Sequence, residues 1–247
     1  MKISRKFFFV LFIFFFVSCK ENKELKKYSF ALSGAITNPT EQYLILSEVG
    51  KSGFSQNDTI PLDKEGVFSK NIEMQEPTLY SLALGNEYII ICPAIGEQIT
   101  IKASGNNFSG TYNIEGSPES ELLKELNKEN YNVRLSLKSM SEELSKADSA
   151  KLDSIRTSII EKYTSTKQYQ EKITSDFINK NLGSLTTLIA LYRTFDGFAL
   201  FDHNQSLEMH KKVLQGLKQT LPNNQHTLTL ENFIAEKENA QKENGTK

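Results

Sequence analysis

The sequence predicts an α+β protein in which an N-terminal antiparallel β-sandwich or barrel-like domain precedes an α-helical hairpin or bundle. Between residues 28 and 116, apolar residues alternate or form short bursts, and turn residues interrupt them roughly every eight to twelve positions. Over residues 117–236, apolar residues instead recur every three or four positions, as they do on one face of a helix. We therefore predict two folded domains, with a boundary near residue 116.

Residues 1–18 have the pattern of a cleaved secretory signal peptide. Three basic residues among the first six precede eleven consecutive apolar residues, 7–17. Such a run is too short to span a bilayer, which requires about 20 apolar residues. We therefore expect this segment to direct export and then to be removed.

A cysteine, Cys19, follows the apolar run and comes directly after the small residue Ser18. This arrangement resembles the lipoprotein box of bacteria, in which the cysteine becomes the new N-terminus and is acylated; Phe16 occupies the position where leucine is usual. Two or more acyl chains anchor a protein stably, because each buried CH₂ contributes about 0.8 kcal/mol. We predict lipidation of Cys19, a charged tether over 19–27, and an outer-membrane location facing the periplasm or the cell surface. The alternative is an ordinary signal peptide with an incidental cysteine.

The composition excludes some partners and some chemistry. The chain carries 29 Lys and Arg against 30 Asp and Glu, and removal of residues 1–18 would leave a net charge of −4. That balance is unlike the basic surface of a nucleic-acid-binding protein. With Cys19 acylated, Cys92 would be the one remaining thiol, so no internal disulfide could form. Cys92 lies in an apolar strand pattern and is expected to be buried; a reactive thiol is the alternative.

Eight strands are predicted in the first domain, and the turns between them are rich in Gly, Asn, Pro and Asp. Glycine and asparagine supply the positive φ angles that such turns need. The segment Tyr88–Cys92 is apolar on both faces, which predicts a central position in its sheet. The predicted strands are Ser29–Thr37, Tyr43–Glu48, Asn57–Leu62, Val67–Met74, Thr78–Leu84, Tyr88–Cys92, Gln98–Ala103 and Thr111–Glu115.

A long helical hairpin is predicted to follow. The first helix should start at Pro118, because Ser117 can cap it and acidic residues occupy its first turn. Its apolar stripe has one polar gap at Asn130, and a break at residues 147–149 separates it from a second long stripe. Two long helices with so short a connection should pack antiparallel.

Three shorter helices complete the prediction. A short helix is expected over 185–192, followed by an aromatic-rich turn at 195–198. A further apolar stripe runs from Leu207 to Leu221, and a last helix contains residues 228–234. The polar residues 237–247 predict a disordered tail.

Several short patterns together resemble the N-terminal region of certain bacterial membrane-anchored thiol–disulfide oxidoreductases, over roughly residues 28–233. In that family, a β-rich domain of unknown function and a helical segment precede a thioredoxin-like domain. The W-C-x-x-C active site of that domain has no counterpart here, so the resemblance implies no catalytic residue. The patterns are Phe30-x-Leu32-x-Gly34-x-Ile36, Asp58-Thr59 with Gly66-x-Phe68, Ile95-Gly96 with Ile99 and Ile101, Gly116-Ser117, and Phe177-Ile178-x-x-Asn181 leading to Ser184.

No catalytic constellation is recognisable in the sequence. His203 and His210 are seven residues apart and would share a helix face, but neither they nor His226 belong to a metal-binding motif, so no metal site is predicted. Motifs of serine hydrolases and of phosphate-binding loops are missing as well, and no cofactor is predicted. Four tyrosines could line a concave site on the β domain, although strand packing is their more usual role: Tyr43, Tyr80, Tyr88 and Tyr112.

We therefore expect a lipid-anchored, non-catalytic binding or adaptor protein of the cell envelope. Acyl chains on Cys19 would hold it at the membrane, and its ligand would be a protein or small molecule. A second hypothesis is an accessory role in thiol–disulfide exchange with a separate thioredoxin-like partner, where Cys92 would be the available thiol. A third is an unrecognised envelope hydrolase that uses His203 or His210. A fourth is a coding sequence truncated before a thioredoxin-like domain.

Overall fold

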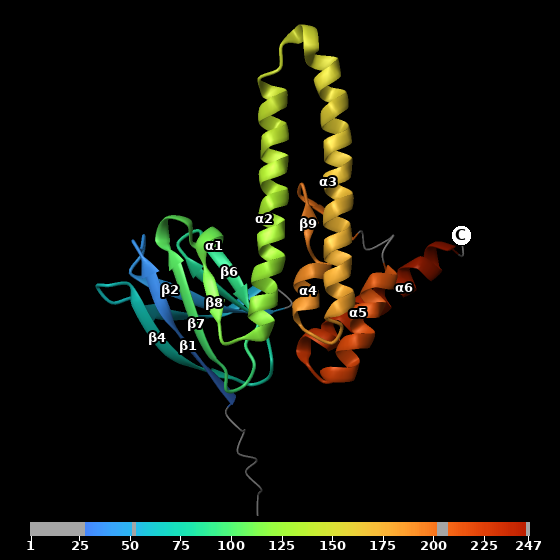
Figure 1. The fold of residues 1–247 in the computed structure, drawn as a ribbon. Helices are drawn as coiled ribbons and strands as arrows, with labels where there is room; N and C mark the ends of the chain where they lie inside the picture. Colours follow the sequence, from blue (N-terminus) through green and yellow to red (C-terminus); the bar gives the residue numbers. More distant parts are fainter. Residues whose placement is uncertain (1–27, 51–52, 202–206, 246–247) are drawn as a thin grey trace, which may run out of the picture.

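Two four-stranded sheets form the N-terminal part of the protein, and helices with one short two-stranded sheet form the rest (Figure 1). The computed structural model describes residues 28–50, 53–201 and 207–245. Side chains from both sheets meet in one apolar core, which confirms the predicted α+β class and the order of its parts. The first sheet has the order β4 (Val67–Met74), β1 (Tyr28–Thr37), β7 (Gln98–Ser104) and β8 (Asn113–Glu115). The second has the order β3 (Gly53–Pro61), β2 (Tyr43–Gly50), β5 (Tyr80–Leu84) and β6 (Glu87–Ile91).

The pairing of β1 with β7 is parallel, whereas the other strand pairs of the described residues are antiparallel. The register places Gly34 beside Ile101. A Cβ atom added to Gly34 would lie only 1.8 Å from the carbonyl oxygen of Ile101. Glycine at this position therefore allows the close approach of the two central strands of the first sheet.

The expectation that Tyr88–Cys92 is central in its sheet is wrong, because β6 lies at the edge of the second sheet. Ile89 and Ile91 point into the core of the sandwich. Ile90, on the other face, packs against the apolar core formed by the helices. The strand is apolar on both sides because it lies between two cores, and not because strands flank it on both sides.

The two long helices α2 (Pro118–Ser145) and α3 (Leu152–Lys180) form the predicted antiparallel hairpin, which projects well beyond the sheets (Figure 1). A 3₁₀ turn, η2 (Ser149–Lys151), joins them. The polar gap in the first stripe is part of the contact between the helices, since Gln170 Nε2 donates a 2.9 Å hydrogen bond to Asn130 Oδ1.

Shorter elements complete the fold. A 3₁₀ turn, η1 (Gly105–Asn107), and a one-turn helix, α1 (Phe108–Thr111), precede β8, so the strand predicted from Thr111 is shorter than expected. After α3 come the elements α4 (Thr186–Leu191), β9 (Thr194–Phe195), β10 (Phe198–Ala199), α5 (Leu207–Thr220) and α6 (Gln225–Gly245).

Helix α6 continues past residue 237, where a disordered tail was expected to begin. The residues there include many Glu, Lys, Gln and Ala, which favour helix even without an apolar stripe. A 3.0 Å ion pair between Lys211 and Glu238 also fixes this part of α6 to α5. Within the described residues, no helix combines the length and apolar character that a membrane span requires.

Candidate functional site

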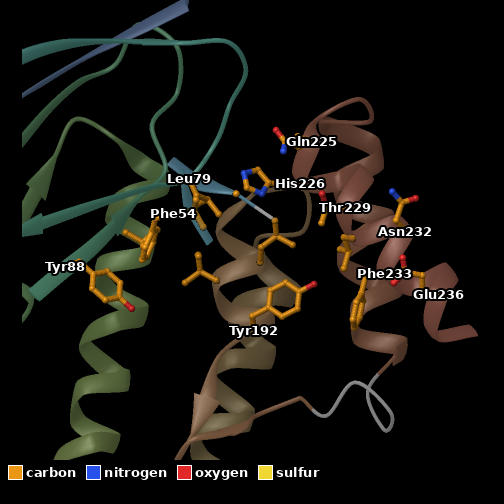
Figure 2. A pocket seen from close by; sticks show the side chains of 16 residues that line it. Phe54, Leu79, Tyr88, Tyr192, Gln225, His226, Thr229, Asn232, Phe233 and Glu236 are labelled. Carbon is orange, nitrogen blue, oxygen red and sulfur yellow. The ribbon is translucent and has the colours of Figure 1, made fainter. Parts of the chain in front are cut away.

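An apolar pocket of about 600 Å³ lies between the second sheet and the helices α4 and α6 (Figure 2). We call it the interface pocket. Its volume falls within the range of small-molecule sites, which is about 300–1,000 Å³. The sheet and the helices both contribute side chains, and those used below are Phe54, Tyr88, Leu188, Tyr192, His226 and Phe233.

Three aromatic side chains at this pocket remain exposed to solvent. The exposed fractions of Phe54, Tyr88 and Tyr192 are 56%, 52% and 47%. Phe54 on β3 and Tyr88 on β6 come from the two opposite edge strands of the second sheet, and their rings pack edge to face with centroids 5.9 Å apart. Tyr192 follows the last residue of α4 and makes an edge-on contact with the buried ring of His210. Part of each ring is therefore not buried in either apolar core, and a ligand in the pocket could contact it.

Hydrogen bonds between the β4–β5 connection and the start of α6 fix the polar end of the interface pocket. Asn224 Nδ2 donates to the Glu76 carboxylate at 3.1 Å and to the Pro77 carbonyl at 2.7 Å. The backbone N–H of Gln225 donates to the same carboxylate, which lies at the positive end of the α6 dipole. Residues almost 150 positions apart in sequence thus hold α6 against the sheet.

His226 contributes to this connection from the first turn of α6. Its Nε2 lies 2.9 Å from Thr78 Oγ1, and the Thr78 hydroxyl donates a 3.3 Å hydrogen bond to the Glu48 carboxylate. The Thr78 oxygen then accepts from His226 Nε2–H, which in a neutral imidazole is the tautomer protonated at Nε2. Burial lowers the pKa of His226, and the carboxylates of Glu76 and Glu48 oppose that effect without cancelling it.

The lowered pKa of His226 predicts a loss of stability at acidic pH. The unfolded chain binds a proton at histidine near pH 6.5, whereas folded His226 binds one only at lower pH. Acidification below about pH 6.5 therefore favours the unfolded state. Urea unfolding between pH 7.5 and 5 should show a smaller loss for His226→Gln than for the wild type. Equal losses in the two proteins would contradict the neutral, buried state of this ring.

Of the other two histidines noted from the sequence, His210 belongs to no metal site of the described structure. His203 lies outside the described residues. His210 is fully buried, with its ring between Tyr192 and Phe233 at centroid distances of 5.9 and 5.6 Å. The described chain contains no cluster of three or more His, Cys, Asp or Glu side chains that could hold a metal ion.

Cys92 is buried, as the strand pattern predicted. Its backbone N–H donates to Ser120 Oγ at 3.0 Å, and the Ser117 hydroxyl donates to its carbonyl. Ser117 was expected to cap α2 with its side chain, but this contact with the β6 end replaces the cap. Burial raises the pKa of the Cys92 thiol well above its usual range, and the nearby carboxylates of Glu119 and Glu97 raise it further. The thiolate, which is the reactive form, is therefore disfavoured.

The Cys92 thiol should resist alkylation in the folded protein. With the Cys19→Ala variant, iodoacetamide at pH 8 should leave the native chain unmodified over an hour and add one carbamidomethyl group in 6 M guanidinium chloride. Intact-mass measurement distinguishes the two states. Labelling of the native chain at the rate of the denatured chain would restore Cys92 as a candidate for thiol–disulfide exchange.

The four tyrosines named from the sequence as a candidate concave site are dispersed. Tyr80 and Tyr112 belong to the core of the sandwich, and Tyr43 is exposed. Tyr88 lines the interface pocket. The predicted lipidation site, Cys19, lies outside the described residues.

Sequence reasoning noted Tyr88 and His226 but missed other residues of the site. Phe54 comes just after a glycine-rich turn, where a single aromatic residue gives no periodic signal. Arg193 was missed as well: its guanidinium is buried, donates to the Leu126 carbonyl and to Asn127 Oδ1, and thereby connects α4 with α2. Desolvation lowers the pKa of Arg193 to about 10, so the group stays charged at neutral pH.

Residues 30–123 match the model of a protein family that is described as a domain of unknown function, DUF4369. The match covers the two sheets and the first residues of α2. The sheet side of the interface pocket therefore lies within the matched segment, and the helical side lies beyond it. No curated protein matches the chain.

Proposed function

We propose that this chain is a lipid-anchored, non-catalytic binding protein of the cell envelope, tethered through an acylated Cys19, and that the interface pocket holds its ligand. The observation that supports this function is the exposed ring surface of Phe54, Tyr88 and Tyr192 around a pocket of ligand size (Figure 2). Exposed apolar surface that is gathered in one place is typical of a binding site.

The charges at the interface pocket favour a cationic ligand. Among its lining side chains, Glu236 is the one with a formal charge at neutral pH, since His226 is held neutral. The faces of aromatic rings attract cations as well. We therefore propose a small molecule with an apolar body and a protonated amine.

We also infer that the β domain is of the type found ahead of thioredoxin-like domains in bacterial lipoproteins, on the basis of the motifs quoted above. The match to a domain of unknown function is compatible with this origin. A role in thiol–disulfide exchange would then require a separate redox partner, because the one described thiol is buried. The exposed aromatic pocket favours ligand binding over that role.

Dansylcadaverine, which joins an aromatic ring system to a primary amine, is a suitable probe for the interface pocket. Its fluorescence should rise on binding to the purified Cys19→Ala chain, and neutral dansylamide should bind more weakly. On the same background, Tyr192→Ala should weaken binding by about tenfold through loss of ring contact. Glu236→Gln should weaken it by about two- to fivefold, as expected for an exposed charge pair.

Matched variants separate the pocket from the rest of the surface. Thr229→Trp adds bulk inside the interface pocket, whereas Leu228→Trp places the same side chain at a neighbouring exposed position outside it. The first variant should abolish the dansylcadaverine signal and the second should keep it, with melting temperatures that show both chains to be folded. Equal effects of the two variants, or equal binding of the amine and the neutral probe, would contradict the proposal.

A further inference from the structure

The outer edge of β6 is available for pairing with another strand. Within the described residues, β5 is the strand paired with β6, and the backbone of Glu87–Ile91 makes no hydrogen bond to any other element. An unpaired edge presents a row of N–H and C=O groups that another extended chain can use. Native proteins usually cover or blunt such an edge, so its accessibility needs an explanation.

Neighbouring elements hold the two ends of this edge and leave its centre open. At the start of β6, Ser109 of α1 donates from its backbone N–H and its hydroxyl to the Glu87 carboxylate, at 2.7 and 2.8 Å. Just past its end, Ser120 of α2 accepts from the Cys92 N–H. Between these contacts, Tyr88, Ile89 and Ile90 line a second hollow of about 550 Å³ between β6 and α2.

We call this hollow the edge pocket, and its residues include Glu87, Tyr88, Asn127, Asn130, Tyr131 and Arg134. It shares Tyr88, Ile90 and Ile189 with the interface pocket, so the two hollows flank the same side chains.

The amide and carboxylate groups of the edge pocket are largely engaged within the protein. Asn127 donates to the Tyr112 hydroxyl and accepts from Arg193. Asn130 accepts from Gln170, and Glu87 accepts from Ser109. A sugar is therefore a poor candidate for the ligand, because its hydroxyl groups would need these same side chains as hydrogen-bond partners. Besides the Arg134 guanidinium, the strand backbone is the main hydrogen-bonding surface of this pocket, and an extended peptide matches it.

The charge at the edge pocket indicates the kind of peptide. The Arg134 guanidinium lies over the Tyr131 ring, 5.6 Å from its centroid. No carboxylate of the described residues lies within ion-pair distance of it, so Arg134 is available for an acidic partner.

We propose that the edge pocket binds an extended peptide segment, which pairs with β6 as an added strand and places an acidic side chain on Arg134. Apolar side chains on the same face of that segment would contact Tyr88 and Ile90. The open centre of β6 is three residues long, or about 10 Å at the rise of a strand, so a core of three to five peptide residues fits. This site adjoins the interface pocket through Tyr88, Ile90 and Ile189, but it does not depend on the ligand proposed there.

Selection from a phage library of random seven-residue peptides tests the proposal. The purified Cys19→Ala chain is the target, and the same chain with Arg134→Glu is used for counter-selection. We expect enriched peptides with Asp or Glu at a fixed position beside alternating apolar residues. Fluorescence anisotropy of one such peptide should show binding that is at least about tenfold weaker for Arg134→Glu. The matched variant Arg156→Glu, at an exposed position on α3, should bind within about twofold of the wild type.

N-methylation of the selected peptide distinguishes strand addition from attraction by charge alone. Alternate N–H groups of an added strand face β6, so methylation at one set of alternate residues should weaken binding by about tenfold or more, and methylation at the other set should have little effect. Thr229→Trp in the interface pocket should leave peptide binding unchanged.

Three results would overturn the proposal: no enrichment over the counter-selected chain, equal effects of the two methylated peptides, or a dimer in light scattering that Arg134→Glu dissociates. The last result would assign the β6 edge to a second copy of the chain. Failure of the dansylcadaverine experiment has no bearing on this outcome, because its probe and its variants address the other pocket.

Discussion

Replacement of Gly34 by alanine should unfold the β domain or cost about 3 kcal/mol or more of stability, a large part of the 5–15 kcal/mol typical of a domain. The added Cβ would lie 1.8 Å from the Ile101 carbonyl oxygen and 2.9 Å from the Phe68 ring. Both neighbours belong to strands paired with β1, so relief requires the central strands of the first sheet to separate. Urea unfolding followed by circular dichroism measures the loss.

The control for this substitution is Gly50→Ala on β2. A Cβ atom there would meet its nearest neighbours at 3.5 Å, which is ordinary contact. This variant should change the unfolding free energy by less than about 1 kcal/mol. If both variants unfold at the same urea concentration as the wild type, then β1 and β7 do not approach as closely as described.

Replacement of Cys19 by alanine should move the protein from the membrane fraction to the soluble fraction of its own cells. If Cys19 is acylated as proposed, the substitution removes the anchoring free energy of its acyl chains, about 0.8 kcal/mol for each buried CH₂. The described strands and helices start at Tyr28, so the melting temperature should not change. Fractionation with radiolabelled palmitate measures both the location and the label.

Cys92→Ala is the matched control for the anchor experiment, because it removes the buried thiol and keeps Cys19. That variant should retain the label and the membrane location. Membrane retention of the Cys19→Ala chain would show that the anchor lies elsewhere.

The sequence was sufficient for the type and order of the main elements. Alternation along β1, with Phe30 and Leu32 buried, and the start of α2 at Pro118 are local properties that a short window contains. The pairing of the strands was less accessible. The parallel contact of β1 with β7 joins residues nearly 70 positions apart, and no local pattern specifies it. The edge position of β6 was also missed, because helices can bury an outer face as well as strands can.

The candidate site depends even more on contacts between distant residues. Glu76 meets Asn224 across 148 positions, and this contact sets α6 against the sheet to form one wall of the interface pocket. Tyr88 was noted from the sequence among four tyrosines, but the sequence could not separate it from the buried Tyr80 and Tyr112. Which aromatic rings remain exposed is decided by the packing of the helices on the sheets.

Native mass spectrometry of the protein purified from its own cells tests the central claim, that the interface pocket holds a ligand. We predict that the wild-type chain carries a small bound molecule. This molecule should bear a protonatable amine and should leave the chain on collisional activation. The same molecule should be missing from Thr229→Trp and present in Leu228→Trp. A wild-type chain without any bound molecule, or one that Thr229→Trp retains in full, would contradict the account.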